Sequence, residues 1–157
     1  MTMQIQIRRA TAEDAKAVYE IVLRAVQETN ARDYPASVID RLALTLPEKV
    51  ASKLHEWEAY VAAVDGRVVG TGSLNGQEVS SVFVHPDYQG RGIGAKLMDA
   101  IESGANIQPG SALILQSSIT AQPFYAKRGF KVVCEAFYGE ERTIHMSKDI
   151  SNLSSRA

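Results

Sequence analysis

The chain has 157 residues, of which 45% are hydrophobic and 22% charged, and this length and composition predict one soluble globular domain with a substantial core. A net charge of −1 at pH 7 gives no general cationic field, which argues against nucleic acid or an anionic membrane as a partner. The single cysteine excludes an intramolecular disulfide and a multi-cysteine metal site, and fits a reducing compartment. No apolar run approaches the roughly 20 residues that span a bilayer, and no signal peptide is evident. We therefore expect a cytoplasmic protein without a membrane partner.

The chain begins with a strand and a helix. Residues 4–9 alternate polar and apolar side chains, as in a half-buried strand. Thr11 then resembles a helix N-cap, and apolar residues recur after it at helical spacing. Residues 30–56 are less regular, and we predict a short helix over 38–46 and a second one that starts at Pro47.

Three antiparallel strands are predicted next. Residues 57–64 and 67–74 are β-rich runs joined by Asp65-Gly66, a pair that favours a hairpin turn matching the twist of two strands. Asn-Gly at 75–76 repeats this device before the run 78–84. The third strand leads directly into a glycine-rich segment.

The glycine-rich segment carries Gly90, Gly92 and Gly94 and continues into an amphipathic helix expected to end near residues 103–104. Alternating glycines let the backbone approach a ligand, and the N–H groups of the following first helical turn point the same way. The helix dipole adds partial positive charge there, which Arg91 could supplement. The segment therefore predicts an anion site, most simply for phosphates.

The rest of the chain reads as strand, helix and a closing strand pair. The expected ranges are a buried strand at 112–116, a short helix at 120–128, and antiparallel strands at 130–137 and 142–148. Cys134 falls on the first strand of that pair, where we expect a small core residue. Residues 1–150 are predicted to form one domain, followed by a polar tail at 151–157.

Two common phosphate motifs fit the glycine segment poorly. A P-loop needs Gly-Lys-Ser/Thr, but Ala95 precedes Lys96 and Leu97 follows it, and leucine cannot bind Mg²⁺. The dinucleotide pattern Gly-x-Gly-x-x-Gly/Ala is formally met. That motif should follow its strand almost at once and be answered by an acidic residue at the end of the next strand, and neither holds here.

A third interpretation rests on two stretches. Residues 89–94 read Gln-Gly-Arg-Gly-Ile-Gly behind Val-His-Pro, and residues 121–130 place Tyr125 shortly before a Gly-Phe pair. Together they resemble the acyl-CoA signature and the C-terminal motif of the GNAT superfamily of N-acetyltransferases. The resemblance covers nearly the whole chain. It implies a mixed α/β (α+β) fold, with a twisted, mostly antiparallel sheet of about seven strands, flanking helices and a splayed central strand pair.

The resemblance also implies how acetyl-CoA would bind as co-substrate, without a metal. The pantetheine arm would lie in the splay and bond the backbone of Phe83 and Val84 as an added strand. Ser118 stands where the family often has an asparagine that contacts the cofactor, and a serine hydroxyl has a shorter reach. The residues whose amides would hold the pyrophosphate are Gln89, Gly90, Arg91, Gly92, Ile93 and Gly94.

The implied reaction is acetyl transfer to an amine by direct attack in a ternary complex. Glu78 occupies the place of the family's general base, although a solvent-facing glutamate at a strand start would look the same. Tyr125 occupies the place of the general acid that protonates the thiolate, with a core aromatic as the alternative. The acceptor is expected to be a small-molecule amine or a peptide amine, so a protein lysine or N-terminal acetyltransferase is an alternative. A non-catalytic acyl-CoA sensor is another, and a homodimer, common in the family, stays open.

Overall fold

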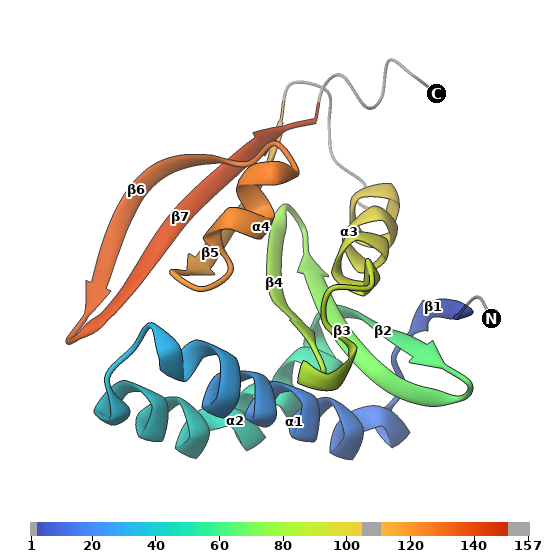
Figure 1. Ribbon diagram of the computed structural model, residues 1–157. Coiled ribbons are helices and arrows are strands. Elements are labelled where there is room, and N and C mark those ends of the chain that lie inside the picture. Colours follow the sequence, from blue (N-terminus) through green and yellow to red (C-terminus); the bar gives the residue numbers. More distant parts are fainter. Residues whose placement is uncertain (1–2, 105–110, 151–157) are drawn as a thin grey trace.

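A seven-stranded sheet with the order β1-β2-β3-β4-β5-β7-β6 runs through the computed structural model, which describes residues 3–104 and 111–150 (Figure 1). The pair β4–β5 is parallel and the other neighbouring strands are antiparallel, which confirms the predicted mixed, mostly antiparallel sheet. The predicted tail at 151–157 lies outside the described residues. The strands are β1 (Ile5–Arg9), β2 (Glu58–Val64), β3 (Arg67–Asn75), β4 (Glu78–Val84), β5 (Ala112–Ser118), β6 (Lys131–Tyr138) and β7 (Glu141–Asp149).

Helices cover both faces of the sheet. Helices α1 and α2 lie side by side along one face, and α3 and α4 pack on the other (Figure 1). A π-helical turn and a 3₁₀ turn connect α1 to α2, and two further 3₁₀ turns precede α1 and follow β4. The helical elements are η1 (Ala12–Asp14), α1 (Ala15–Arg24), η2 (Ala25–Thr29), η3 (Asn30–Arg32), α2 (Ala36–Glu56), η4 (Pro86–Tyr88), α3 (Ile93–Gly104) and α4 (Gln122–Lys127).

The central strands β4 and β5 separate soon after they meet. Their pairing consists of Glu78 with Ile114 and Val79 with Leu115. Beyond it, β4 has a register shift against β3 between Thr71 and Ser73, which indicates a β-bulge that bends the strand. The predicted splay is therefore present, and it leaves backbone groups at the end of β4 without a sheet partner on the β5 side.

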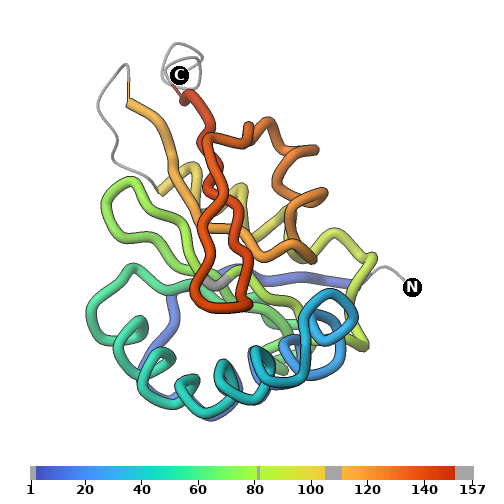
Figure 2. Tube along the Cα trace, turned by 90° about the vertical axis from the view of Figure 1, so that its left-hand side faces the viewer, coloured from blue at the N-terminus to red at the C-terminus, as the bar shows by residue number. Residues whose placement is uncertain are grey.

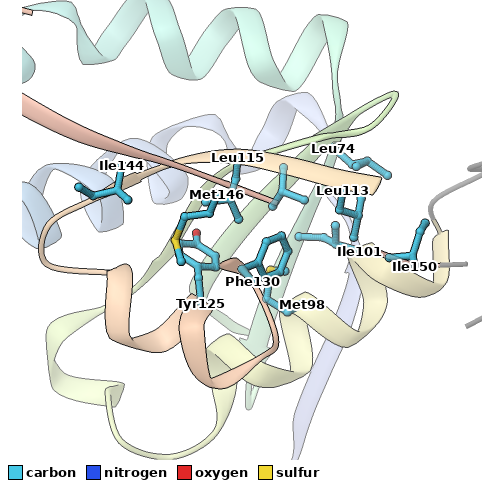
Figure 3. Close-up of a cluster of buried hydrophobic side chains, with 11 residues drawn as sticks. Leu74, Met98, Ile101, Leu113, Leu115, Tyr125, Phe130, Ile144, Met146 and Ile150 are labelled. Atoms are coloured by element: carbon cyan, nitrogen blue, oxygen red, sulfur yellow. The ribbon is translucent and has the colours of Figure 1, made fainter. Parts of the chain in front are cut away.

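The largest buried cluster joins α3 and α4 to β5 and β7 (Figure 3). Its members are apolar side chains that alternate along the strands and recur at helical spacing along α3, as the sequence pattern predicted. Tyr125 of α4 belongs to this cluster. The centroids of its ring and the Phe130 ring are 5.8 Å apart, and the rings meet edge to face. The cluster fixes α4 against the sheet beside the splay.

Helix α2 corrects the prediction of two short helices. It is one continuous helix of 21 residues, and Pro47 lies inside it rather than at a helix start. Proline removes one backbone hydrogen bond, that to the carbonyl four residues earlier. Pro47 is exposed, so that carbonyl can bind water, while buried Leu46 and Val50 pack the helix against the sheet.

Cys134 corrects a second expectation. It is exposed rather than a core residue. Within residues 3–104 and 111–150, its strand, β6, is at the edge of the sheet and pairs with β7 alone. Val132, Val133 and Phe137 lie on the same strand and are also exposed. A run of residues that favour strands therefore does not predict burial when the strand lies at the edge of the sheet.

Asp14 fixes the turn between β1 and α1. Arg8 donates two hydrogen bonds to its carboxylate, at 2.8 and 2.9 Å, and the N–H of Thr11 donates a third at 2.8 Å. These bonds, chiefly those from Arg8, lower the pKa of Asp14 against the opposing effect of its burial. The carboxylate therefore stabilises the fold at pH values above its unfolded-state pKa of about 3.9, and this contribution is lost as the pH falls through the lower folded-state pKa.

We expect Asp14→Asn to lower the free energy of unfolding by about 1 to 2 kcal/mol at pH 7, because it removes the charged acceptor of three hydrogen bonds. The difference from the unmodified protein should shrink as the pH is lowered from the unfolded-state pKa of about 3.9 toward 3, because the unfolded chain then binds a proton that the folded carboxylate resists. Urea denaturation at pH 7 and pH 3 measures both values. Asp40→Asn, at an exposed position on α2, is the control and should change neither. An Asp14→Asn deficit equal at both pH values would contradict the assignment.

Candidate active site

The glycine segment forms a loop that needs glycine at two positions. Gly90 and Gly92 have φ angles of +76° and +80°, which side-chain-bearing residues rarely adopt. No atom lies within 4 Å of where a Cβ would stand on either residue, so the loop presents open backbone. Helix α3 begins directly after it at Ile93, and the first-turn N–H groups of a helix have no acceptor within the helix. The loop and helix start thus have the chemistry of an anion site.

Gln89 braces this loop. Its side-chain Nε2 donates to the carbonyl of Val84 at 3.3 Å and to the hydroxyl of Thr29 at 3.4 Å, which ties the loop to β4 and η2. The guanidinium of Arg91 instead lies over the ring of Tyr88, 5.2 Å from its centroid. Tyr88 itself lines the adjoining cavity, so the Arg91 side chain lies against one of the residues that form it.

A cavity of about 450 Å³ runs from this loop into the splay. Predicted site residues line it from three directions: the glycine loop, the end of β4 and the end of β5 followed by α4. They are Phe83, Val84, Gln89, Gly90, Gly92, Ile93, Gly94, Ser118 and Tyr125. We call this space the loop-side cavity. Its lining includes the residues that the resemblance implies for pantetheine and pyrophosphate, whose binding stays a prediction.

A second cavity, of about 350 Å³, lies on the α1–α2 face of the sheet. Its walls are mostly apolar side chains of α1, η2 and α2, and its polar groups come from η3 and α2 as well as from β3, β4, β5 and β7. Glu78 lines it, as do Lys49 and Lys53 of α2 and Glu141 of β7. We call it the helix-side cavity.

The two cavities meet at the splay. Asn30, Phe83, Gln116 and Ser118 line both of them. The hydroxyl of Ser118 accepts a hydrogen bond from the N–H of Ala121 at 3.0 Å, which fixes the turn from β5 into α4 and leaves the hydroxyl proton for another acceptor. Two bound molecules, one in each cavity, would therefore come together between β4 and β5.

Tyr125 and Glu78 lie on opposite sides of this junction. Tyr125 lines the loop-side cavity and is 5% exposed, and its burial raises the pKa of the phenol. The phenol therefore stays protonated and can act as a hydrogen-bond donor. Glu78, half-buried at the start of β4, lines the helix-side cavity. The two predicted catalytic residues thus line different cavities.

Lys53 places an amine with a lowered pKa in the helix-side cavity. Its Nζ donates a hydrogen bond to the hydroxyl of Ser80 on β4 and lies 5.1 Å from the centroid of the Trp57 ring. Burial, together with the charge of neighbouring Lys49, lowers the pKa of Lys53 to about 8, although Glu78 opposes the shift. At the position of Lys53 the surroundings therefore favour the neutral amine more than water does.

Comparison with known proteins identifies the family. Residues 30–149 match the model of the acetyltransferase (GNAT) domain. The chain belongs to the GNAT acetyltransferase family. It is 32% identical over 132 residues to the peptidyl-lysine N-acetyltransferase YjaB of Salmonella typhimurium, covering 83% of this chain and 86% of that one.

Solved GNAT structures share the fold. A GCN5-related N-acetyltransferase from Rhodopseudomonas palustris superposes with a TM-score of 0.86 at 29% identity, covering 95% of this chain and 98% of that one. The PaiA N-acetyltransferase of Thermoplasma acidophilum, solved in complex with coenzyme A, gives a TM-score of 0.70 at 20% identity, covering 94% and 99%. At that identity the likeness shows the fold alone.

Two negative findings concern the described residues of this GNAT domain. Among residues 3–104 and 111–150, no three histidine, cysteine or acidic side chains gather in a way that could hold a metal ion. Over the same ranges, no helix has the length and apolar character to cross a membrane. Cytoplasmic location stays a prediction from the sequence.

The β6–β7 hairpin closes the helix-side cavity of this GNAT domain. Its tip reaches the start of α2 (Figure 2), where Arg41 pairs with Glu141 at 2.8 Å and Ser37 donates to Glu140 at 2.7 Å. Tyr34 lines the same cavity and is 8% exposed. Its hydroxyl donates to the carbonyl of Arg142 at 2.6 Å and accepts from the N–H of Ile119 at 2.8 Å. One hydroxyl thus joins three segments around the cavity.

We expect Tyr34→Phe to lower the free energy of unfolding by about 1 to 3 kcal/mol, because it leaves the carbonyl and N–H that the hydroxyl joined without this partner. The KM for an amine acceptor should rise more than the KM for acetyl-CoA, since the wall that loosens belongs to the helix-side cavity. Urea denaturation and initial rates measure the two effects. Tyr19→Phe on α1 is the control, because no hydrogen bond to its hydroxyl is found in the described part of the chain. Equal losses in both variants would contradict this role.

Sequence reasoning missed three residues of the site. Gln116 alternates with the buried residues Leu113 and Leu115, so the period of the strand could have placed it on the opposite face, toward the helix-side cavity. Asn30 and Lys53 gave no such signal. A lysine in the last turns of a helix is commonplace, and only the packing of α2 on β4 turns it into the cavity.

Proposed function

We propose that this GNAT domain is an N-acetyltransferase that moves an acetyl group from acetyl-CoA to an amine by direct attack in a ternary complex. The observation that carries the proposal is the meeting of the loop-side and helix-side cavities between β4 and β5. One cavity has the phosphate chemistry of a glycine loop at a helix start, and the other is lined by the amine of Lys53, whose pKa is lowered by burial. A donor and an acceptor held there would meet without a covalent enzyme intermediate.

The loop-side cavity fits acetyl-CoA. The open backbone at Gly90 and Gly92 leaves room for a pyrophosphate, which the amides of the loop and of the first turn of α3 would bind. The unpaired β4 edge at Phe83 and Val84 would bond the pantetheine amides. Bound acetyl-CoA supplies a thioester, an acetyl group activated toward amines. Arg91 would contribute its backbone N–H, and its guanidinium lies over the ring of Tyr88, which lines the same cavity.

The proposed reaction needs two proton movements, one away from the amine and one toward the departing thiolate. An alkyl amine with a pKa of about 10.4 is almost entirely protonated at pH 7, at a cost of about 4 to 5 kcal/mol for forming the nucleophile. The environment that lowers the pKa of Lys53 would reduce this cost, and Glu78 would accept the proton. On the other side, Tyr125 would donate a hydrogen bond to the departing thiolate.

The acceptor class follows from the relatives and the cavity. The YjaB relative is named a peptidyl-lysine N-acetyltransferase, which supports a peptide amine. A cavity of about 350 Å³ with apolar walls also suits a small amine with an apolar body. Both acceptors use the same junction chemistry, so they are alternatives within one proposal.

Initial-rate kinetics with varied acetyl-CoA and amine tests the proposal. Direct attack predicts intersecting double-reciprocal lines and thiol release that requires the amine. Cys134→Ser should give the same pattern and rates, because Cys134 lies on the edge strand and lines neither cavity. Parallel lines, with thiol release before the amine binds, would instead require an acyl-enzyme. The absence of acetyl-CoA binding in calorimetry would overturn the proposal entirely.

A further inference from the structure

Lys53 places an amine of the protein inside the cavity proposed for the amine acceptor. It lies in the last turns of α2 and is half-buried, with its Nζ bonded to the hydroxyl of Ser80 and its side chain against Trp57. Its ammonium or amine group is therefore directed at β4, the strand that borders the splay. In this position Lys53 resembles a bound acceptor more than a surface lysine.

The bulge in β4 brings this amine close to the junction. Ser80 pairs with Ser73, and Phe83 pairs with Thr71, so these two β4 residues lie opposite positions only two residues apart on β3. Two residues of strand span about 7 Å. Phe83 lines both cavities, so the backbone of Ser80, whose hydroxyl holds Nζ, lies about that far along the sheet from a residue of the junction. The four-carbon stem of a lysine can cover this distance by changing rotamers.

The surroundings also make the amine nucleophilic. An ordinary lysine is neutral in about one molecule in a thousand at pH 7.4. With the pKa of Lys53 lowered to about 8 by burial and by Lys49, the neutral fraction is about one in five. The geometry brings the side chain near the thioester site, and the environment supplies its reactive form.

We propose that Lys53 is itself an acetylation site, modified in cis from acetyl-CoA bound in the loop-side cavity when the helix-side cavity holds no acceptor. The Nζ lone pair attacks the thioester carbonyl carbon, a C–N bond forms and the C–S bond breaks. The nitrogen loses a proton to Glu78 or water, and the departing thiolate takes up a proton. The inference rests on the proposed function only for the binding of acetyl-CoA at the glycine loop.

The modification would limit the enzyme's own activity. Acetylation makes Lys53 neutral, removes its ammonium donors and adds an acetyl group to the helix-side cavity. An acceptor amine would then compete for less space. We expect acetylated protein to retain acetyl-CoA binding and to lose acetyl transfer to external amines, by about tenfold or more.

Mass spectrometry of the whole protein tests the inference. The full chain is incubated with acetyl-CoA and no amine, and we expect a gain of about 42 Da that peptide mapping places on Lys53. The rate should not depend on protein concentration, as for a reaction within one molecule, and an external amine substrate should slow it. Lys53→Arg should abolish the label, whereas Lys16→Arg, at an exposed position on α1, should label as the unmodified protein does.

A variant that blocks the loop separates enzymatic from chemical acetylation. Gly92→Glu should reduce labelling of Lys53 at least tenfold. Equal labelling in that variant, or labelling of Lys49 and exposed lysines in place of Lys53, would overturn the inference. An unlabelled protein that binds acetyl-CoA and acetylates an amine would overturn it while leaving the proposed function intact. Failure to bind acetyl-CoA in calorimetry would overturn both.

Discussion

Gly92→Glu should weaken acetyl-CoA binding by about 100-fold or more. The new carboxylate would stand on the open face of the loop, where the pyrophosphate is proposed to bind. Two like charges about 4 Å apart near a protein surface repel by about 4 kcal/mol, and each 1.4 kcal/mol is a tenfold change in affinity. Isothermal titration calorimetry of the variant beside the unmodified protein measures the loss.

The chain offers a matched control for this variant. Gly66, in the turn between β2 and β3, has a φ of +81°, close to the +80° of Gly92, and is equally open. Gly66→Glu therefore adds the same charge and a similar backbone strain, about 1 to 3 kcal/mol, away from both cavities. It should bind acetyl-CoA normally. Equal weakening in the two variants would mean that strain or charge in general, and not the loop, sets the affinity.

Tyr125→Phe should lower kcat for amine acetylation by about 100-fold and change the Kd for acetyl-CoA by less than about twofold. The substitution keeps the ring that packs in the core cluster (Figure 3) and removes only the donor proposed to stabilise the thiolate. Stopped-time assays of thiol release give kcat, and calorimetry gives the Kd. This result would separate an enzyme from an acyl-CoA sensor, in which binding alone matters.

Tyr60→Phe is the control for Tyr125→Phe. Tyr60 is a partly buried tyrosine that packs against the same cluster and lines neither cavity. Removing its hydroxyl should change kcat by less than about twofold relative to the unmodified protein. If Tyr125→Phe retained full activity, another group would have to protonate the thiolate. If both variants lost activity equally, the effect would be one of packing.

The sequence predicted the fold and the conformation of the glycine loop well, because both depend on local signals. Asp65-Gly66 fixes a hairpin through its own backbone preferences, and strand and helix periods identify the buried faces. The spacing of Gly90 and Gly92 before a helix is likewise a local requirement, met by the observed positive φ angles. For these elements the residues that carry the signal are also the residues that form the structure.

The helix-side cavity could not be predicted in the same way. It is formed by contacts between segments far apart in the chain, such as Tyr34 with Arg142 and Lys53 with Ser80. Pro47 gave a misleading local signal, since tertiary packing holds α2 together across it. The exposure of Cys134 could not be predicted either. The local sequence indicates a strand, but only the strand order shows that this strand lies at the edge of the sheet.

The splay between β4 and β5 should make the stability of the folded protein depend on a bound ligand. Backbone groups at the end of β4, unpaired on their β5 side, make a sheet that is complete only when a ligand fills the gap. A ligand that binds the folded state alone stabilises it by about 2.7 kcal/mol at one hundred times its Kd. Resistance to proteases and slow amide exchange along β4 should therefore rise and fall with the supply of acetyl-CoA, so that the abundance of the enzyme follows the metabolic state of the cell.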